Sequence, residues 1–172
     1  MKKPITTIIF VLFSILSGGC SAGCDHMQER PAGQSDVIAL ACDPIPVVRV
    51  GFIGLGMRGI GAVERFMHLD SVEVVALCDL EAENLARSQA VLREKAKPEA
   101  AEYMGPEGWK RLCERPDIDL VYISTDWLSH TPMAVYAMEQ GKHVAVEVPA
   151  AVTVEECWNC LLYTSPSPRD CS

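Results

Sequence analysis

The chain lacks an excess of positive charge. Its 172 residues carry 15 Lys and Arg against 23 Asp and Glu, which gives a formal net charge of −8. A surface of that sign repels the phosphates of nucleic acids and of anionic lipids. We therefore expect no nucleic-acid partner. Any bound anion must be held locally, by a helix terminus or a single arginine.

Near its N-terminus, the sequence also lacks an apolar run long enough to cross a bilayer. The apolar stretch 5–16 follows the basic pair Lys2 and Lys3 and is shorter than a transmembrane helix. Small residues then lead to Cys20. This pattern resembles a bacterial lipoprotein signal with Cys20 as the lipidated residue, and the alternatives are lipidation at Cys24 or plain secretion.

These features divide the N-terminal part of the chain into two segments. We expect residues 1–19 to be a signal peptide and residues 20–45, which are polar and carry Gly, Pro and Ser, to be a flexible tether. The protein is then expected to be exported to the periplasm or outer membrane of the bacterial cell envelope. It would contact a membrane only through its lipid anchor.

Regular cysteine spacing is absent as well. The chain has eight cysteines, but their irregular spacing does not favour a disulfide framework. Cys78 ends an apolar run and is expected to be a small buried hydrophobe. Cys157 and Cys160 form a C-x-x-C pair with no second pair or histidine cluster beside it, so neither a metal site nor a redox site is expected.

What the sequence does contain is an alternation of apolar runs with helix-length amphipathic segments. That alternation is typical of a parallel α/β sheet with helices on both faces. The expected fold class is α/β, a Rossmann-type doubly wound parallel sheet. Strands are predicted at 47–53, 72–78, 100–104, 120–125 and 143–147, and helices at 58–69, 82–97, 106–114 and 131–140.

Several residues predict where helices begin and end. Thr131 before Pro132 predicts a helix start, and Gly141 predicts the end of the same helix. Thr153 and Glu156 form a capping box that opens a further helix. Periodicity then stops near Asn159, and Ser-Pro repeats follow. The segment 160–172 resembles translated adapter sequence, so we expect it to be non-native and the natural protein to continue.

The most informative motif is G-x-G-x-x-G, formed by Gly54, Gly56 and Gly59 directly after an apolar run. Asp79 lies 20 residues after the last glycine, at the end of the next apolar run. Together these features predict a dinucleotide-binding βαβ unit. Gly54 permits the turn, Gly56 lets a pyrophosphate approach the backbone, and Gly59 lets the helix pack on the strand. The alternative is a glycine-rich turn that binds no ligand.

Asp79 also predicts which dinucleotide binds. A carboxylate at this place accepts hydrogen bonds from the adenosine ribose and repels a 2′-phosphate, which favours NAD over NADP. The alternative role for Asp79 is a helix N-cap. Arg58 can pair with a phosphate oxygen, with a solvated side chain as its alternative.

Several separated motifs together resemble the glucose–fructose oxidoreductase/inositol dehydrogenase (Gfo/Idh/MocA) family. They are Gly54–Gly59, Cys78–Leu80, Asp119–Ile123, Thr125–His130 and Gly141–Pro149. The resemblance covers about residues 47–159. It implies an incomplete NAD-binding Rossmann domain over 46–159, followed in the natural protein by an α/β substrate domain that this chain lacks.

One departure narrows the resemblance. Ordinary dehydrogenases of the family carry Glu-Lys-Pro where this chain has Glu147-Val148-Pro149, and valine cannot perform acid–base chemistry. The variant resembles glycoside hydrolase family 109, the NAD-dependent α-N-acetylgalactosaminidases. That resemblance implies hydrolysis by transient oxidation, elimination, water addition and reduction with bound NAD, on a glycan ending in N-acetylgalactosamine.

The resemblance also implies the cofactor contacts. Besides the three glycines and Asp79, they are Met57, Arg58, Trp127, Leu128, Ser129, His130, Glu147 and Val148. From the residues alone, Trp127 has the alternative of a core aromatic, His130 of a capping residue, and Glu147 of a strand-end carboxylate that accepts from backbone N–H groups. The catalytic residues are expected beyond residue 159.

Two other functions stay open at this point. The chain can belong to an NAD-dependent sugar or polyol dehydrogenase of the same family, or it can be a dinucleotide-binding module without catalysis of its own. We expect the 172-residue chain alone to be inactive. A homo-oligomer of the full-length protein is an open alternative to a monomer.

Overall fold

The computed structural model describes residues 42–163, in which five strands alternate with five helices. The strands are β1 (Val48–Ile53), β2 (Val72–Asp79), β3 (Ala101–Met104), β4 (Leu120–Ile123) and β5 (His143–Val146). The helices are α2 (Met57–Phe66), α3 (Ala82–Glu94), α4 (Gly108–Cys113), α5 (Trp127–Glu139) and α6 (Val154–Tyr163). The predicted signal peptide, most of the tether including Cys20, and residues 164–172 of the tail lie outside the described residues.

The strands form one parallel sheet in the order β3-β2-β1-β4-β5. Ile53 at the end of β1 pairs with Cys78 on one side and with Ile123 on the other. The chain winds outward from β1 in one direction and then returns to wind in the other. This confirms the predicted doubly wound sheet, and it places a topological switch point between β1 and β4.

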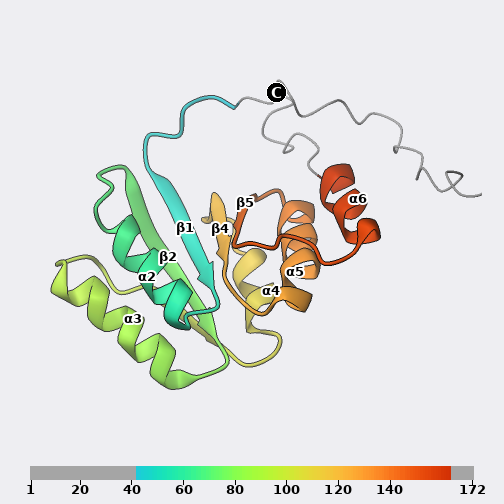
Figure 1. The fold of residues 1–172 in the computed structure, drawn as a ribbon. Coiled ribbons are helices and arrows are strands. Elements are labelled where there is room, and N and C mark those ends of the chain that lie inside the picture. The colour runs from blue at the N-terminus through green and yellow to red at the C-terminus, as the bar shows by residue number, and fades with distance from the viewer. Residues whose placement is uncertain (1–41, 164–172) are drawn as a thin grey trace, which may run out of the picture. The chain divides into compact units, whose positions relative to one another are not determined.

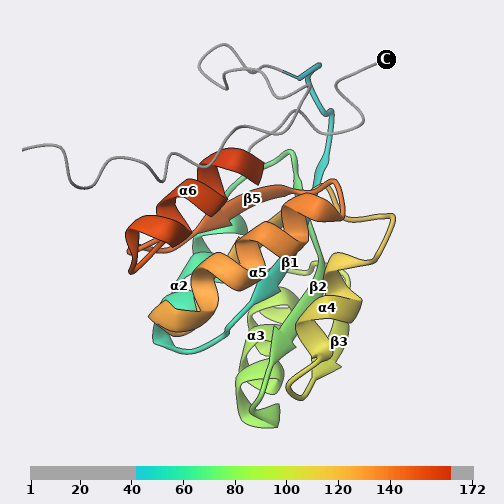
Figure 2. The same cartoon turned by 90° about the vertical axis from the view of Figure 1, so that its right-hand side faces the viewer.

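The helices cover both faces of the sheet. Helices α2 and α3 lie on one face and helices α4 and α5 on the other (Figures 1 and 2). Successive β1 residues alternate between the two resulting cores, because side chains along a strand point to opposite faces. Phe52 packs with Ala62, Val63 and Leu77 on the first face, whereas Ile53 packs with Val121 on the second.

The start of α5 corrects the prediction of a helix at 131–140. The helix begins four residues earlier, because the Asp126 carboxylate accepts hydrogen bonds from the backbone N–H groups of Leu128 and Ser129, at 3.1 and 3.2 Å. Asp126 is therefore the N-cap, and Thr131 lies inside the helix. Pro132 also lies inside it, where its missing N–H leaves the exposed Leu128 carbonyl without a helical donor.

Other predicted helix ends match the structure. Gly141 has φ +70°, and the N–H groups of Gly141 and Lys142 donate to the carbonyls of Met138 and Ala137, which closes α5 in a Schellman motif. The capping box also forms. The Glu156 N–H donates to Thr153 Oγ1 at 3.1 Å, and the Thr153 N–H donates to Glu156 Oε2 at 3.0 Å.

Other helices differ in length from the prediction: α2 ends at Phe66 instead of residue 69, and α4 is shorter than the predicted 106–114 at both ends. Helix α6 continues to Tyr163, four residues past the point where the sequence loses its period. Helix α3 ends at Glu94 instead of Lys97, because Ala96 adopts a left-handed φ of 53° before Pro98 is reached. The residue before a proline is also disfavoured in the helical region.

Candidate functional site

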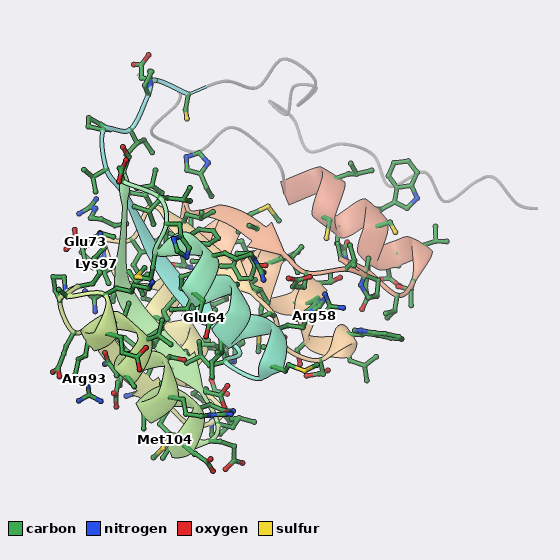
Figure 3. All side chains as sticks on the ribbon, turned by 60° about the vertical axis from the view of Figure 1, so that its left-hand side comes forward. Arg58, Glu64, Glu73, Arg93, Lys97 and Met104 are labelled. Carbon is green, nitrogen blue, oxygen red and sulfur yellow. The ribbon has the colours of Figure 1, made fainter. Side chains whose placement is uncertain are left out.

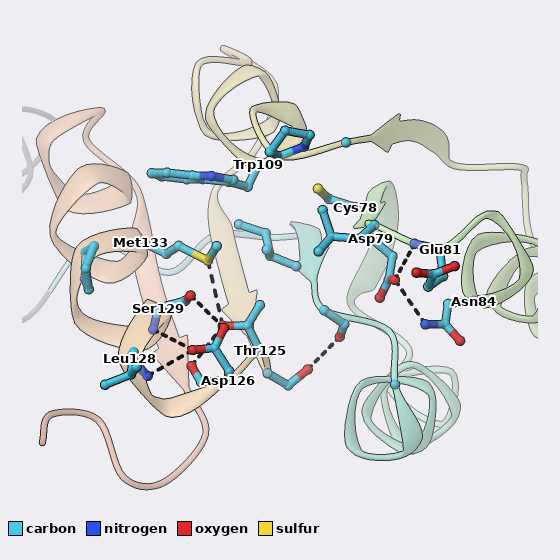
Figure 4. A pocket seen from close by; sticks show the side chains of 18 residues that line it. Cys78, Asp79, Glu81, Asn84, Trp109, Thr125, Asp126, Leu128, Ser129 and Met133 are labelled. Atoms are coloured by element: carbon cyan, nitrogen blue, oxygen red, sulfur yellow. Dashed lines mark hydrogen bonds between the residues drawn. The ribbon is translucent and has the colours of Figure 1, made fainter.

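A cleft of about 580 Å³ lies at the carboxyl ends of the strands. Ligands of open parallel sheets bind at this edge, beside the switch point. Figure 4 shows the side chains that line it, contributed by the ends of β1, β2 and β4, the β3–α4 loop, and the starts of α3, α4 and α5. Among the residues predicted to bind a cofactor, the lining includes Gly54, Gly56, Asp79, Leu128 and Ser129.

Glycine suits each of the three positions of the motif for a different physical reason. Gly54 has φ +83°, a conformation that L side chains rarely adopt. A Cβ on Gly59 would overlap the Gly54 carbonyl oxygen, so only glycine lets α2 approach β1 so closely. A Cβ on Gly56 would meet nothing within 4 Å. The protein itself therefore needs no glycine at position 56, and the space there is open toward the cleft.

The N-terminus of α2 follows this loop directly. Its first-turn N–H groups have no partner within the helix, and its first turn carries no acidic residue. Met57 and Arg58 in this turn are exposed. In Figure 3, Arg58 lies at the start of α2, well separated from Arg93 in the last turn of α3 and from Lys97 beyond that helix. The combination of free N–H groups and an adjacent guanidinium suits an anion.

The Asp79 carboxylate is fixed beside the glycine loop. Its Oδ2 accepts from the Leu55 N–H at 2.6 Å, and its Oδ1 accepts from the Glu81 N–H at 2.8 Å and from Asn84 Nδ2 at 3.0 Å. Three donors hold this side chain without a ligand. The alternative of an N-cap role is wrong, because the N-cap of α3 is Glu81.

The segment 127–130 divides between the cleft and the interior. Leu128 and Ser129 line the cleft. Trp127 is 64% exposed, so it is not a core aromatic. His130 is only 1% exposed, its Nδ1 lies 2.8 Å from the Pro149 carbonyl oxygen, and its Nε2 has no hydrogen-bond partner. The neighbouring Thr131 hydroxyl donates to the Ala150 carbonyl at 2.8 Å.

Together, His130 and Thr131 attach the loop after β5 to α5. Whether His130 also contacts a cofactor stays a prediction. Asp126, which caps this helix, has its pKa lowered, chiefly by the Ser129 hydroxyl that donates to it at 2.6 Å and also by the two capping N–H groups. This carboxylate is thus ionised at neutral pH.

Glu147 and Val148 lie at the end of β5. Glu147 Oε1 accepts a hydrogen bond from the Tyr122 hydroxyl at 2.7 Å, a side-chain partner that replaces the backbone N–H groups we considered as the alternative. Burial and this neighbouring carboxylate raise the pKa of Tyr122. Val148 is 82% exposed. Neither residue lines the cleft, so their predicted contact with the cofactor stays a prediction.

The cleft also contains residues that the sequence analysis did not single out. Asn84, Trp109, Thr125, Asp126 and Met133 all line it. Sequence spacing could have identified two of them. Asn84 lies in the first turn of the helix that follows Asp79, and Asp126 lies three residues before Ser129, which is the spacing of an N-cap. Trp109 and Met133 had no such signal, because only the packing of α4 against α5 brings them to this edge.

Within residues 42–163, other predicted features can also be placed. Cys78 is buried, as expected, and Cys42, Cys113, Cys157 and Cys160 are likewise free thiols. No group of three or more His, Cys, Asp or Glu side chains in this part of the chain gathers in an arrangement that could hold a metal ion. None of its helices has the length and apolarity to cross a membrane.

Comparison with known proteins agrees with this geometry. Residues 48–163 match the Gfo/Idh/MocA family model, described as an oxidoreductase family with an NAD-binding Rossmann fold. The chain is 60% identical over 163 residues to glycosyl hydrolase family 109 protein 1 of Bacteroides fragilis (strain YCH46), covering 92% of this chain and 35% of that protein. It is 54% identical over 142 residues to an α-N-acetylgalactosaminidase of Bacteroides fragilis (strain ATCC 25285), covering 83% and 33%. The chain thus spans about a third of the length of these relatives.

Solved structures resemble the described part of the chain. The myo-inositol dehydrogenase of Lactobacillus casei, crystallised with NAD(H) and myo-inositol, aligns with a TM-score of 0.58 and 29% identity over 68% of this chain and 33% of the other. The glycine loop, the Asp79 carboxylate and the sheet order therefore have a common explanation. The chain belongs to the Gfo/Idh/MocA oxidoreductase family and carries its NAD-binding Rossmann domain.

Proposed function

We propose that this chain is the NAD-binding part of an exported glycoside hydrolase that removes terminal α-N-acetylgalactosamine from glycans. The names of the relatives at 60% and 54% identity support the hydrolase class and the sugar. The observation that carries the cofactor assignment is the open space at Gly56, beside the free N–H groups of α2 and within the same cleft as Asp79. Bound NAD supplies the site with a hydride acceptor and donor.

Residues in the cleft and Arg58 beside it have distinct roles in holding the dinucleotide. The start of α2 and Arg58 offer donors to the two phosphates. Asp79 accepts from the ribose hydroxyls, and its three present donors fix the carboxylate in place before binding. Leu128 and Ser129 form the facing wall. These side chains bind and orient the cofactor.

Val148 separates the hydrolase from a dehydrogenase of the same family. It is exposed at the end of β5 and has no ionisable group, so it cannot move a proton at a sugar hydroxyl. We therefore place the acid–base groups of the reaction in the remaining two thirds of the relatives' length.

Isothermal titration calorimetry with NAD⁺ on the 172-residue chain tests the cofactor site. The wild-type chain is expected to bind, and Gly56→Ala to weaken binding about tenfold, because a methyl group fills the space left for the phosphates. The matched control is Gly61→Ala, in the middle of the same helix, where the added Cβ meets only the flexible end of Arg65 at 3.3 Å. Absence of NAD⁺ binding by the wild-type chain would refute the assignment.

A second titration compares NAD⁺ with NADP⁺. The wild-type chain is expected to prefer NAD⁺, because the Asp79 carboxylate repels a 2′-phosphate. Asp79→Asn removes the charge while keeping the shape, so the ratio of the two dissociation constants should move toward one. An unchanged ratio would show that Asp79 does not face the ribose.

The reaction is tested with the protein extended to the length of its relatives. Incubation with 4-nitrophenyl α-N-acetylgalactosaminide should release nitrophenol without net formation of NADH. Steady accumulation of NADH on free sugar would favour the dehydrogenase instead. The 172-residue chain alone should release no aglycone.

Export and anchoring belong to the same proposal. Metabolic labelling with a fatty acid in a bacterial host should label the protein, and Cys20→Ser should abolish the label. Loss of the label in Cys24→Ser but not in Cys20→Ser would move the anchor to the second cysteine. A protein that is secreted without a fatty-acid label would support export and refute the lipid anchor.

A further inference from the structure

Tyr122 on β4 fastens the end of β5 with its side chain. Its hydroxyl donates to Glu147 Oε1 at 2.7 Å, and the Glu147 N–H donates to the carbonyl of Ile123, the next residue of β4, at 2.9 Å. Residue 147 is therefore fixed to β4 by its side chain and by its backbone. We propose that Tyr122 is a positioning residue: through Glu147 it fixes the end of β5 against the second nucleoside of the bound dinucleotide, the one across the pyrophosphate from Asp79. This inference rests on the proposed NAD site.

The strand order decides which nucleoside comes near Glu147. Asp79 ends β2 on one side of β1, and the glycine loop and the start of α2 follow β1. A pyrophosphate joins two nucleosides. A dinucleotide with one ribose at Asp79 and its phosphates at the glycine loop therefore extends its second nucleoside over β4 and β5, on the other side of β1 (Figure 1). Neighbouring strands lie about 4.8 Å apart, so the end of β5 is about 10 Å from the end of β1, within reach of a nucleoside attached to the phosphates.

Val148 is the residue that this arrangement presents. It follows Glu147 directly, and the Pro149 carbonyl after it accepts from His130 Nδ1 at 2.8 Å. Its backbone thus has a fixed residue on either side, whereas its side chain is 82% exposed. An apolar side chain that is held in one place before binding loses little freedom when it contacts the face of a ring, which favours affinity. The end of β5 is thus preorganised for contact with a ligand.

The Tyr122 ring is itself fixed by an aromatic cluster on the α2 face of the sheet. Its centroid lies 5.3 Å from that of Phe52 and 5.6 Å from that of Phe66. Burial, with the Glu147 carboxylate, raises the pKa of the hydroxyl, so this group keeps its proton and stays a donor at neutral pH. Because the ring is held by its apolar neighbours, the hydroxyl can be removed while the ring stays in place.

Titration of the 172-residue chain with NAD⁺ and with ADP separates a positioning role from a purely structural one. ADP carries the adenosine and both phosphates but lacks the second nucleoside. Tyr122→Phe keeps the ring in its cluster and removes the bond to Glu147. NAD⁺ should then bind more weakly, on the order of tenfold, which is what one hydrogen bond to a carboxylate contributes. ADP should bind to this variant as it does to the wild type.

The matched control is Tyr136→Phe on α5. The Tyr136 hydroxyl also donates to a carboxylate, Glu114 Oε1, at 2.7 Å. Neither of these two residues lines the cleft, so both ligands should bind to this variant as they bind to the wild type. Glu147→Ala removes the Tyr122 bond from its other end and should weaken NAD⁺ at least as much as Tyr122→Phe. The double variant should lose little more than Glu147→Ala alone, because both changes act through one bond.

The fluorescence of bound NADH gives a readout that does not depend on affinity. The reduced nicotinamide ring emits, and its polarisation at saturating protein reports how firmly the ring is held. Polarisation should be high in the wild type and in Tyr136→Phe, and lower in Tyr122→Phe. Far-ultraviolet circular dichroism at the titration temperature establishes that every variant is folded.

The outcomes separate the two proposals. If the wild-type chain does not bind NAD⁺, the proposed cofactor site fails. If it binds NAD⁺ and Tyr122→Phe binds NAD⁺ as tightly, the positioning role is refuted and the cofactor site stands. Equal weakening of NAD⁺ and ADP would also overturn the inference, because it would show a general loosening of the domain. So would equal affinity of the wild type for the two ligands, because the second nucleoside would then contact nothing on this chain.

Discussion

The two walls of the cleft are built by different means. On one side, the glycine loop and α2 are shaped by backbone geometry, through a positive φ at Gly54 and a helix that touches the Gly54 carbonyl at Gly59. On the other side, α5 and the end of β5 are held by side chains, through the Asp126 cap and the bonds from His130 and Thr131 to the loop after β5. Backbone geometry within a few residues determines the first wall. Hydrogen bonds between residues 19 positions apart in the chain determine the second.

This difference explains where residues with predicted cofactor contacts are found. Gly54, Gly56 and Asp79 all line the cleft. In the segment after β4, Leu128 and Ser129 do so, whereas His130 is turned into the interior. A side chain on a helix points according to where the helix begins, and the start of α5 lies four residues before the one that the sequence suggested.

The largest expected effect is on the backbone-built wall. Gly59→Ala should lower the free energy of unfolding by about 3 kcal/mol or more, because the new methyl group overlaps a backbone carbonyl that cannot move aside. Urea denaturation measures the change. Gly61→Ala, two residues further along α2, is the matched control and should change stability by less than about 1 kcal/mol. Equal effects at both positions would mean that helix α2 does not rest on the Gly54 carbonyl.

The next effect concerns the wall built by side chains. His130→Ala should destabilise the domain by about 2 kcal/mol, since it removes a buried ring and its bond to the Pro149 carbonyl. Thr131→Val keeps the shape and removes one hydrogen bond, so a loss of about 1 kcal/mol is expected. Thermal denaturation compares the two. A loss of NAD⁺ affinity in His130→Ala alone would indicate a direct contact with the cofactor.

The smallest effect concerns the Asp126 cap. Asp126→Ala should cost about 1 kcal/mol of stability at neutral pH, because two N–H groups and the Ser129 hydroxyl lose their acceptor. The folded-state pKa of Asp126 is lowered, so the stabilisation by its charge is present above the ordinary carboxyl pKa of about 4 and is lost as the pH falls through the folded value.

Urea titrations between pH 7 and pH 2 check this sign. The difference in stability between the wild type and Asp126→Ala should shrink as the solution becomes more acidic than about pH 4. Asp126→Asn, which caps without a charge, should stay close to the wild type and should not show the same dependence on pH. A difference that grows on acidification would contradict the assignment of the charge.

Most of the fold was predictable, because its signals are local. The apolar runs lie at the strands, Gly141 closes α5, and Thr153 and Glu156 open α6, each through a pattern contained within a few residues. The errors have physical causes too. Ala96 ends α3 early through a backbone conformation that no residue type announces, and α6 runs to Tyr163 although the sequence period is lost near Asn159.

The sequence by itself determined the sheet type, the glycine loop and the acid that faces it, because those features depend on the space around a backbone and on residue spacing along one chain segment. Only the tertiary structure decided that His130 is buried, that Glu147 pairs with Tyr122, and that Trp109 and Met133 line the same cleft as Cys78. Those arrangements depend on how helices from distant parts of the chain pack across the sheet, and no pattern within a single segment encodes that packing.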